Sequence, residues 1–149
     1  MPGSSVAVRA VTPADAEAVA ALLTELGHPT DAVDVPARLE SLLAEGGAAF
    51  VAVDGANHAL GFISVARHAV VHAAGPVALI TALVITGAAR RRGAGRTLVA
   101  AAREWARRAG CARLSVTSGE HRADAHAFYQ ACGLPYTGRR FSTPLEPEP

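Results

Sequence analysis

The stretch ARRRGAGRTLV, residues 89–99, decides how the rest of the chain is interpreted, because it joins three arginines to a glycine pair and then turns aliphatic. It follows the apolar run 75–85 and opens a helical pattern. A strand, a glycine-rich turn and a helix in this order present backbone N–H groups and a positive helix end to an anion. The same order also suits a plain strand-to-helix connection with solvated arginines. The rest of the chain has to decide between the two.

Two familiar phosphate loops do not match this turn. A Walker A loop requires a lysine at the start of the helix, and the chain contains no lysine. A dinucleotide-binding fingerprint requires a third glycine where Leu98 stands. What remains is the pattern Arg90-x-x-Gly93-x-Gly95 after a long apolar strand.

This pattern resembles the acyl-CoA-binding motif of the GNAT family of N-acetyltransferases, Gln/Arg-x-x-Gly-x-Gly/Ala. A second stretch, ADAHAFYQACGL at 123–134, is similar to a later helix of that family, Ala-x-x-Phe-Tyr-x-x-x-Gly-Phe, with Leu134 in place of the final aromatic residue. The order of the expected elements also resembles that fold, so the likeness covers nearly the whole chain. It implies an acetyl-CoA-dependent N-acetyltransferase.

The hydrophobic pattern predicts one α/β domain over residues 1–149, with a mixed, mostly antiparallel sheet and helices on both faces. Residues 144–149 are expected to form a frayed tail. In the second helix, Leu39, Leu42 and Leu43 are expected to point inward. The expected strands are 6–11, 48–54, 59–70, 75–85, 111–118 and 136–145, and the expected helices are 13–27, 36–45, 93–109 and 122–132.

Charge is unevenly distributed although the formal net charge is only +1. Residues 1–54 carry eight acidic side chains against two arginines, whereas residues 90–113 carry eight arginines against one glutamate. This asymmetry favours an anionic ligand for the second half, and the modest total argues against a dedicated nucleic-acid binder. The sequence shows no membrane-spanning run and no secretory signal, which predicts a cytoplasmic protein. No metal site is expected, because His68 and His72 lie on a predicted strand without suitable partners.

The resemblance implies where the coenzyme binds. In the family, backbone N–H groups of the turn hold the CoA pyrophosphate, and the main chain of the preceding strand pairs with the pantetheine. We expect the strand contribution from Leu83 to Ile85, with the N–H of Val84 polarising the thioester carbonyl. Carried over by position, the predicted turn residues are Arg90, Arg91, Arg92, Gly93, Ala94, Gly95 and Arg96.

The resemblance also implies a general acid, whereas the general base is left open. Tyr129 matches the tyrosine that in many members lies near the CoA sulfur and gives a proton to the leaving thiolate. Glu120 is the base candidate, but it could equally cap the following helix, and His121 or ordered water are alternatives. Arg122 stands where the family often has asparagine, so its contact with the coenzyme is undecided. Direct transfer in a ternary complex is expected, without a cysteine nucleophile.

The acceptor is expected near the first two helices, where the acidic side chains lie. An acidic rim favours a cationic primary amine, such as an aminoglycoside, a polyamine or a peptide N-terminus, although solvated helix faces would look the same. His28 is the candidate acceptor contact. A homodimer is left open. The rival hypotheses are a non-catalytic acyl-CoA-binding module and an RNA-binding arginine patch.

Overall fold

The computed structural model describes residues 5–90, 92–117, 123–138 and 141–145. The chain divides into two compact units, Met1–Val116 and Thr117–Pro149. The expectation of a single domain stays a prediction. None of the helices in these described ranges is long and apolar enough to cross a membrane.

The elements follow the sequence pattern closely. Glycines end two of the helices as expected: Gly27 after α1 and Gly110 after α3 both adopt positive φ angles, which a residue without a Cβ tolerates best. The strands are β1 (Ala7–Ala10), β2 (Ala48–Val53), β3 (Ala59–His68), β4 (Val77–Ile85) and β5 (Arg113–Val116). The helices are α1 (Ala16–Leu26), α2 (Val35–Ala44), α3 (Ala94–Arg108) and α4 (Ala123–Ala131), with short 3-10 turns at η2 (Pro13–Asp15), η3 (Ala32–Asp34) and η4 (Gly87–Ala89).

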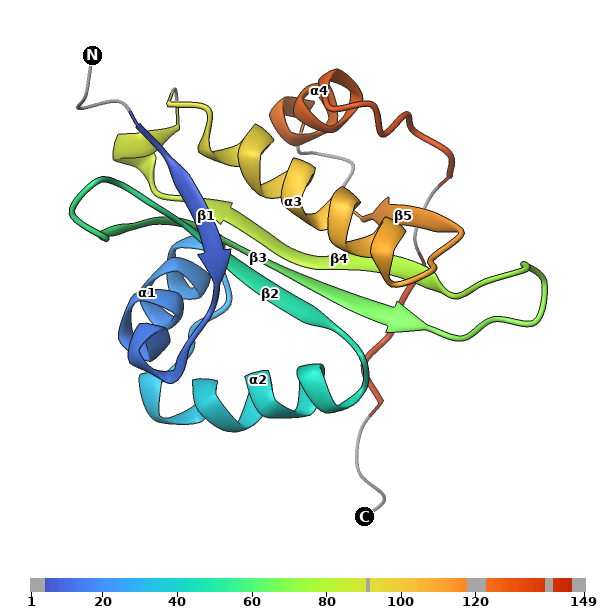
Figure 1. The fold of residues 1–149 in the computed structure, drawn as a ribbon, viewed down its shortest axis with the longest axis horizontal. Helices are drawn as coiled ribbons and strands as arrows, with labels where there is room; N and C mark the ends of the chain where they lie inside the picture. Colours follow the sequence, from blue (N-terminus) through green and yellow to red (C-terminus); the bar gives the residue numbers. More distant parts are fainter. Residues whose placement is uncertain (1–4, 91, 118–122, 139–140, 146–149) are drawn as a thin grey trace. The chain divides into compact units, whose positions relative to one another are not determined.

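The first unit is built on a five-stranded sheet in the order β1-β2-β3-β4-β5. The first four strands pair antiparallel with their neighbours, and β5 pairs parallel with β4 (Figure 1). The helix α3 provides the connection that a parallel pair of strands requires. The predicted mixed, mostly antiparallel sheet is confirmed.

Helices cover both faces of this sheet, as predicted. On one face α3 buries Leu98, Ala102 and Ala106 against Ile63 and Ile80. The opposite face carries a second apolar cluster, in which α1 and α2 pack against β2, β3 and β4 (Figure 1). Alternate residues of each strand therefore belong to different clusters. The cluster to which its neighbours belong shows which face of the sheet a strand residue occupies.

Two sequence-based expectations were wrong. Leu43 of α2 is 55% exposed, because the inward stripe of this helix runs through Leu39 and Leu42 and the residue after Leu42 is turned by about 100° away from it. The expected strand at 136–145 is not formed in the described residues 136–138 and 141–145. Pro135 and Pro144 lack the N–H groups that a strand needs for pairing, which disfavours a ladder at both ends of the segment.

An ion pair fixes the start of α1 to the sheet. Both guanidinium nitrogens Nη1 and Nη2 of Arg9 donate to the carboxylate of Asp15 at 2.8 Å. The backbone N–H of Thr12 donates to the same carboxylate, also at 2.8 Å, and completes the capping box of η2. Arg9 also donates from Nε to Asn57 in the β2–β3 hairpin, so three segments meet at one arginine.

Candidate active site

The arginine-glycine turn joins the end of β4 to the start of α3. The N–H of Ala89 donates to Thr86 and the N–H of Arg92 donates to Ala89, which winds the chain back towards the helix. Gly93 then caps α3 with a φ angle of 80°, in the left-handed region that favours glycine. A Cβ at this position would meet no atom within 4 Å, so the glycine is required by its backbone angle and not by crowding.

The turn leads into the N-terminus of the long helix α3, whose first N–H groups have no partner within the helix. The first backbone bond within α3 runs from the N–H of Thr97 to the carbonyl of Gly93, at 3.1 Å. The N–H groups of Gly93, Ala94, Gly95 and Arg96 precede it and so have no partner inside the helix. Arg90 and Arg96 are exposed beside them. This combination of N–H groups, positive helix end and arginines suits a pyrophosphate.

The sheet opens at β4. The parallel pairing of β4 with β5 covers only Val77–Ile80 and ends at the pair Ile80–Val116 (Figure 1). From Thr81 to Ile85, β4 keeps its antiparallel partner β3, but no described strand pairs with its other edge. Unpaired main-chain groups along a strand edge form a template for an extended ligand.

The main-chain groups along this open edge alternate in direction, which bears on the expectation for Val84. The N–H of Thr86 donates to the carbonyl of Leu60 at 2.9 Å, and the register places these residues opposite each other. Because N–H and C=O groups of an antiparallel strand alternate between its two edges, Val84 also faces β3. The groups of Leu83 and Ile85 point to the open edge instead. Leu83, and not Val84, presents an N–H beyond the end of β5.

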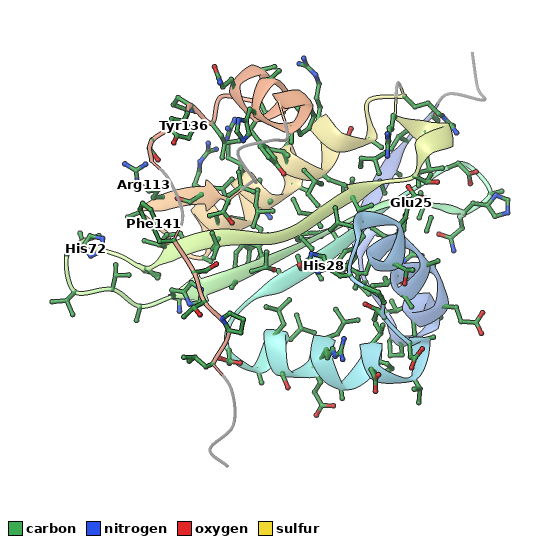
Figure 2. The ribbon with its side chains drawn as sticks, turned by 180° about the vertical axis from the view of Figure 1, so that it is seen from behind. Glu25, His28, His72, Arg113, Tyr136 and Phe141 are labelled. Carbon is green, nitrogen blue, oxygen red and sulfur yellow. The ribbon has the colours of Figure 1, made fainter. Side chains whose placement is uncertain are left out.

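Charge separates across the first unit. A series of acidic side chains is exposed on the side of α1 and α2. Glu25 lies on α1, Asp31 just before η3, Asp34 on η3, Glu40 on α2 and Glu45 just after α2. His28 follows α1 and is exposed; Figure 2 shows it with Glu25 beside this helix. Its N–H donates to the carbonyl of Leu23 at 2.9 Å, which holds the backbone but leaves the imidazole in solvent.

The second unit carries Tyr129 on α4. The ring of Tyr129 packs edge-to-face on Phe128, with ring centroids 5.6 Å apart. The carbonyl of Tyr129 accepts the N–H of Leu134 at 2.9 Å, which closes the end of the helix. The sequence pattern thus placed Tyr129 on the correct element, and its role as acid stays a prediction.

Three other candidates, Arg91, Glu120 and Arg122, lie outside the described residues. Their assignments therefore stay predictions. Within the described ranges, no group of three or more histidine, cysteine, aspartate or glutamate side chains is placed to share a metal ion.

The comparisons with known proteins agree with this geometry. The chain matches the model of the acetyltransferase (GNAT) family over residues 17–134. It is 37% identical to an aminoglycoside N(6')-acetyltransferase type 1 from Stenotrophomonas maltophilia, over 99% of each chain. In structure it resembles AAC(6')-Iy bound to a bisubstrate analogue, with a TM-score of 0.80 and 24% identity over 95% of this chain and 99% of that one. It also resembles AAC(6')-Ih from Acinetobacter baumannii, with a TM-score of 0.81 and 18% identity over 97% and 100% of the two chains.

A mixed sheet that opens beside an arginine-glycine turn fits an acyl-CoA-dependent acyltransferase, and the family match assigns the chain to that class. Within that class the chain belongs to the GNAT acetyltransferase family. It is an N-acetyltransferase that uses acetyl-CoA and acts on an amine. The resemblance inferred from the two motifs is confirmed, and so is the fold.

Proposed function

We propose that the protein acetylates a primary amine of a cationic small molecule of the aminoglycoside class, by direct transfer in a ternary complex. The observation that carries this proposal is the 37% identity, over nearly the full length of both chains, to an aminoglycoside N(6')-acetyltransferase. The exposed acidic side chains of α1 and α2 support it, because aminoglycosides carry several ammonium groups that an acidic surface attracts. His28 is the proposed acceptor contact within that surface.

The residues at the turn and at the open edge of β4 fit acetyl-CoA. We assign the pyrophosphate to the N–H groups of the turn and the arginines around it, and the pantetheine to the open edge at Leu83–Ile85. Since the N–H of Leu83 points to this edge, we assign it to the thioester oxygen in place of Val84. The coenzyme supplies the activated acetyl group as a thioester.

Glu120 and Tyr129 are the groups proposed to transfer protons during the reaction. The attacking amine must be neutral, and its second proton has to leave as the new C–N bond forms and the C–S bond breaks. Glu120 is the proposed acceptor of that proton, directly or through water. Tyr129 is proposed to give its hydroxyl proton to the departing thiolate. We take the two units as one catalytic domain, since the family match spans both.

Calorimetric titration tests the coenzyme site. We expect acetyl-CoA to bind with a micromolar dissociation constant, which corresponds to a binding free energy on the order of 8 kcal/mol. ATP and NAD should not bind comparably. The double variant Gly93→Asp/Gly95→Asp should lose this binding while it still unfolds cooperatively. Equal binding of all three nucleotides by the wild-type protein would reduce the turn to a general anion site.

A pair of antibiotics tests the acceptor. Neomycin B and paromomycin differ at the 6' position, where the first has an amine and the second a hydroxyl group. We expect steady acetylation of neomycin B and none of paromomycin, measured as CoA thiol release. Equal rates with both antibiotics would show that the acetylated amine is not the one at the 6' position. Turnover with peptides but with neither antibiotic would contradict the aminoglycoside class.

A further inference from the structure

Two hydroxyl groups meet where the register of β3 and β4 slips. Ser64 lies opposite Ala82 and Val65 lies opposite Ile80, so Thr81 is an extra residue in β4. The hydroxyl oxygens of Ser64 and Thr81 are 2.7 Å apart. Thr81 Oγ1 also donates to the backbone carbonyl of Ser64 at 3.2 Å. Such bulges redirect a side chain and often lie next to active sites.

The position of this hydroxyl pair links it to the open edge. Thr81 is the first residue of β4 beyond the last pair with β5, Ile80–Val116. Ile63 and Val65 belong to the cluster under α3, so Ser64 between them faces the side of α1 and α2. That is the side with the acidic surface. Ser64 is buried, with 8% of its surface exposed, whereas Thr81 is exposed.

The two hydrogen bonds of the hydroxyl pair leave one acceptor lone pair on Thr81 Oγ1 unused by Ser64. A hydroxyl group has one proton to donate and two lone pairs to accept with. Since Thr81 donates to the carbonyl of Ser64, the proton between the two hydroxyl oxygens comes from Ser64. Thr81 Oγ1 then uses one lone pair for Ser64 and keeps a second lone pair, on a side chain that is exposed. The pair is thus a fixed, uncharged hydrogen-bond acceptor.

On the basis of the proposed function, we infer that Thr81 Oγ1, held by Ser64, accepts a hydrogen bond from the attacking amine. Two residues of extended chain, about 7 Å, separate Thr81 from Leu83. An amine bound at Thr81 is therefore close to an acyl group held at the open edge. An uncharged acceptor raises the pKa of the amine less than a carboxylate would, so it opposes the loss of the ammonium proton less. The hydroxyl pair orients the amine and leaves its proton to another base.

Conservative substitutions test this inference. Thr81→Val removes the acceptor and keeps the branched shape, and we expect kcat/KM for neomycin B to fall about tenfold. The affinity for neomycin B, measured by calorimetry, should fall by a similar factor while the affinity for coenzyme A stays unchanged. Thr81→Ser should retain kcat/KM within about twofold of the wild type. Ser64→Ala should lower it about threefold, because Thr81 loses its anchor.

Thr86→Val is the matched control. Thr86 precedes η4 and makes no side-chain cap hydrogen bond, so the same chemical change should alter kcat/KM by less than about twofold. Thr81→Val with wild-type kinetics and wild-type affinity for neomycin B would overturn the inference alone. So would an equal fall in Thr86→Val, or a fall in Thr81→Val matched by lost coenzyme A binding. Absence of turnover by the wild-type protein would overturn the proposed function and this inference together.

Discussion

At the scale of single residues, Asp15 forms an ion pair with Arg9 that is largely shielded from solvent on the aspartate side. Its carboxylate is nearly buried and accepts hydrogen bonds from Arg9 and from the backbone of Thr12. The hydrogen bonds from Arg9 are the main cause that lowers the pKa of Asp15 to about 2. Two paired nitrogens on two oxygens give a geometry that solvent does not readily replace.

The pH dependence of stability should reveal this interaction. The folded-state pKa of Asp15 lies below its ordinary value of 3.8, so its contribution is present above about pH 4 and lost as the pH falls towards 2. We expect Asp15→Asn to lower the free energy of unfolding by about 2 kcal/mol at neutral pH, and progressively less below pH 4. Urea titrations at pH values from neutral to below 4 measure this difference in the free energy of unfolding. Asp31→Asn, at an exposed aspartate, is the control; a pH-independent loss in Asp15→Asn would contradict the assignment.

Gly93 allows a second test at this scale. An alanine there would meet no neighbour but would have to adopt a φ angle of 80°. We expect Gly93→Ala to cost about 1–2 kcal/mol of stability and to weaken acetyl-CoA binding, because strain at the cap disturbs the N–H groups. Gly87→Ala, equally uncrowded but without a positive φ angle, should change stability by less than about 0.5 kcal/mol. Thermal unfolding and calorimetry compare the two; equal losses would point to a cause other than the backbone angle.

At the scale of elements, β4 shows what sequence can and cannot predict. Its apolar run predicted a central strand, and the turn after it predicted an anion site, because composition and spacing are visible in the sequence. Which residue presents its N–H to the open edge depends on the register with β3. A bulge at Thr81 changes that register without any glycine or proline to signal it. For this reason the sequence placed the polarising N–H at Val84 within the expected stretch Leu83–Ile85. The Ser64–Thr81 pair was missed, although two hydroxyl residues in neighbouring apolar strands were a usable signal.

The same reasoning explains the other errors. The inward stripe of α2 was misjudged by one residue, because Leu42 and Leu43 both fit a helical period within the tolerance of a short helix. Pairing of the segment 136–145 would need a partner edge, and a sequence does not show whether one is present. The base and the acid remained predictions, because their roles depend on proximity between elements far apart along the chain.

A proline scan of two neighbouring positions tests the assignment of β4. Leu83→Pro removes the N–H that points to the open edge and should lower kcat about a hundredfold or more. Val84→Pro removes an N–H that faces β3 and should mainly lower the melting temperature. Comparing kcat and thermal unfolding of both variants separates the effects. A folded Leu83→Pro variant with unchanged kcat would show that another group polarises the carbonyl.

At the scale of the first unit, acidic and basic side chains lie on different elements. The acidic ones gather on α1, η3 and α2, and exposed arginines line the turn and α3. The helix α3 covers one face of the sheet and α1 and α2 cover the other (Figure 1). We therefore expect the anionic coenzyme and the proposed cationic acceptor to be attracted to different sides.

Salt should therefore weaken the binding of both substrates. Raising the salt concentration from about 0.1 M to about 1 M shortens the Debye length from about 10 Å to about 3 Å. We expect the KM values for acetyl-CoA and for neomycin B to rise together, with a much smaller change in kcat. Initial rates with sucrose at matched osmolarity provide the control. KM values that do not respond to salt would show that these surface charges do not guide either substrate.

The early end of β5 has a consequence for backbone exchange with heavy water. Amide hydrogens of Ala82 and Val84 are engaged with β3, whereas those of Leu83 and Ile85 face the open edge. Deuterium should therefore replace hydrogen quickly at every second position of one well-ordered strand. Coenzyme A should slow only that fast set, since the ligand occupies the place where another strand would lie. Resolved amide signals would thus report occupancy of the site without any turnover.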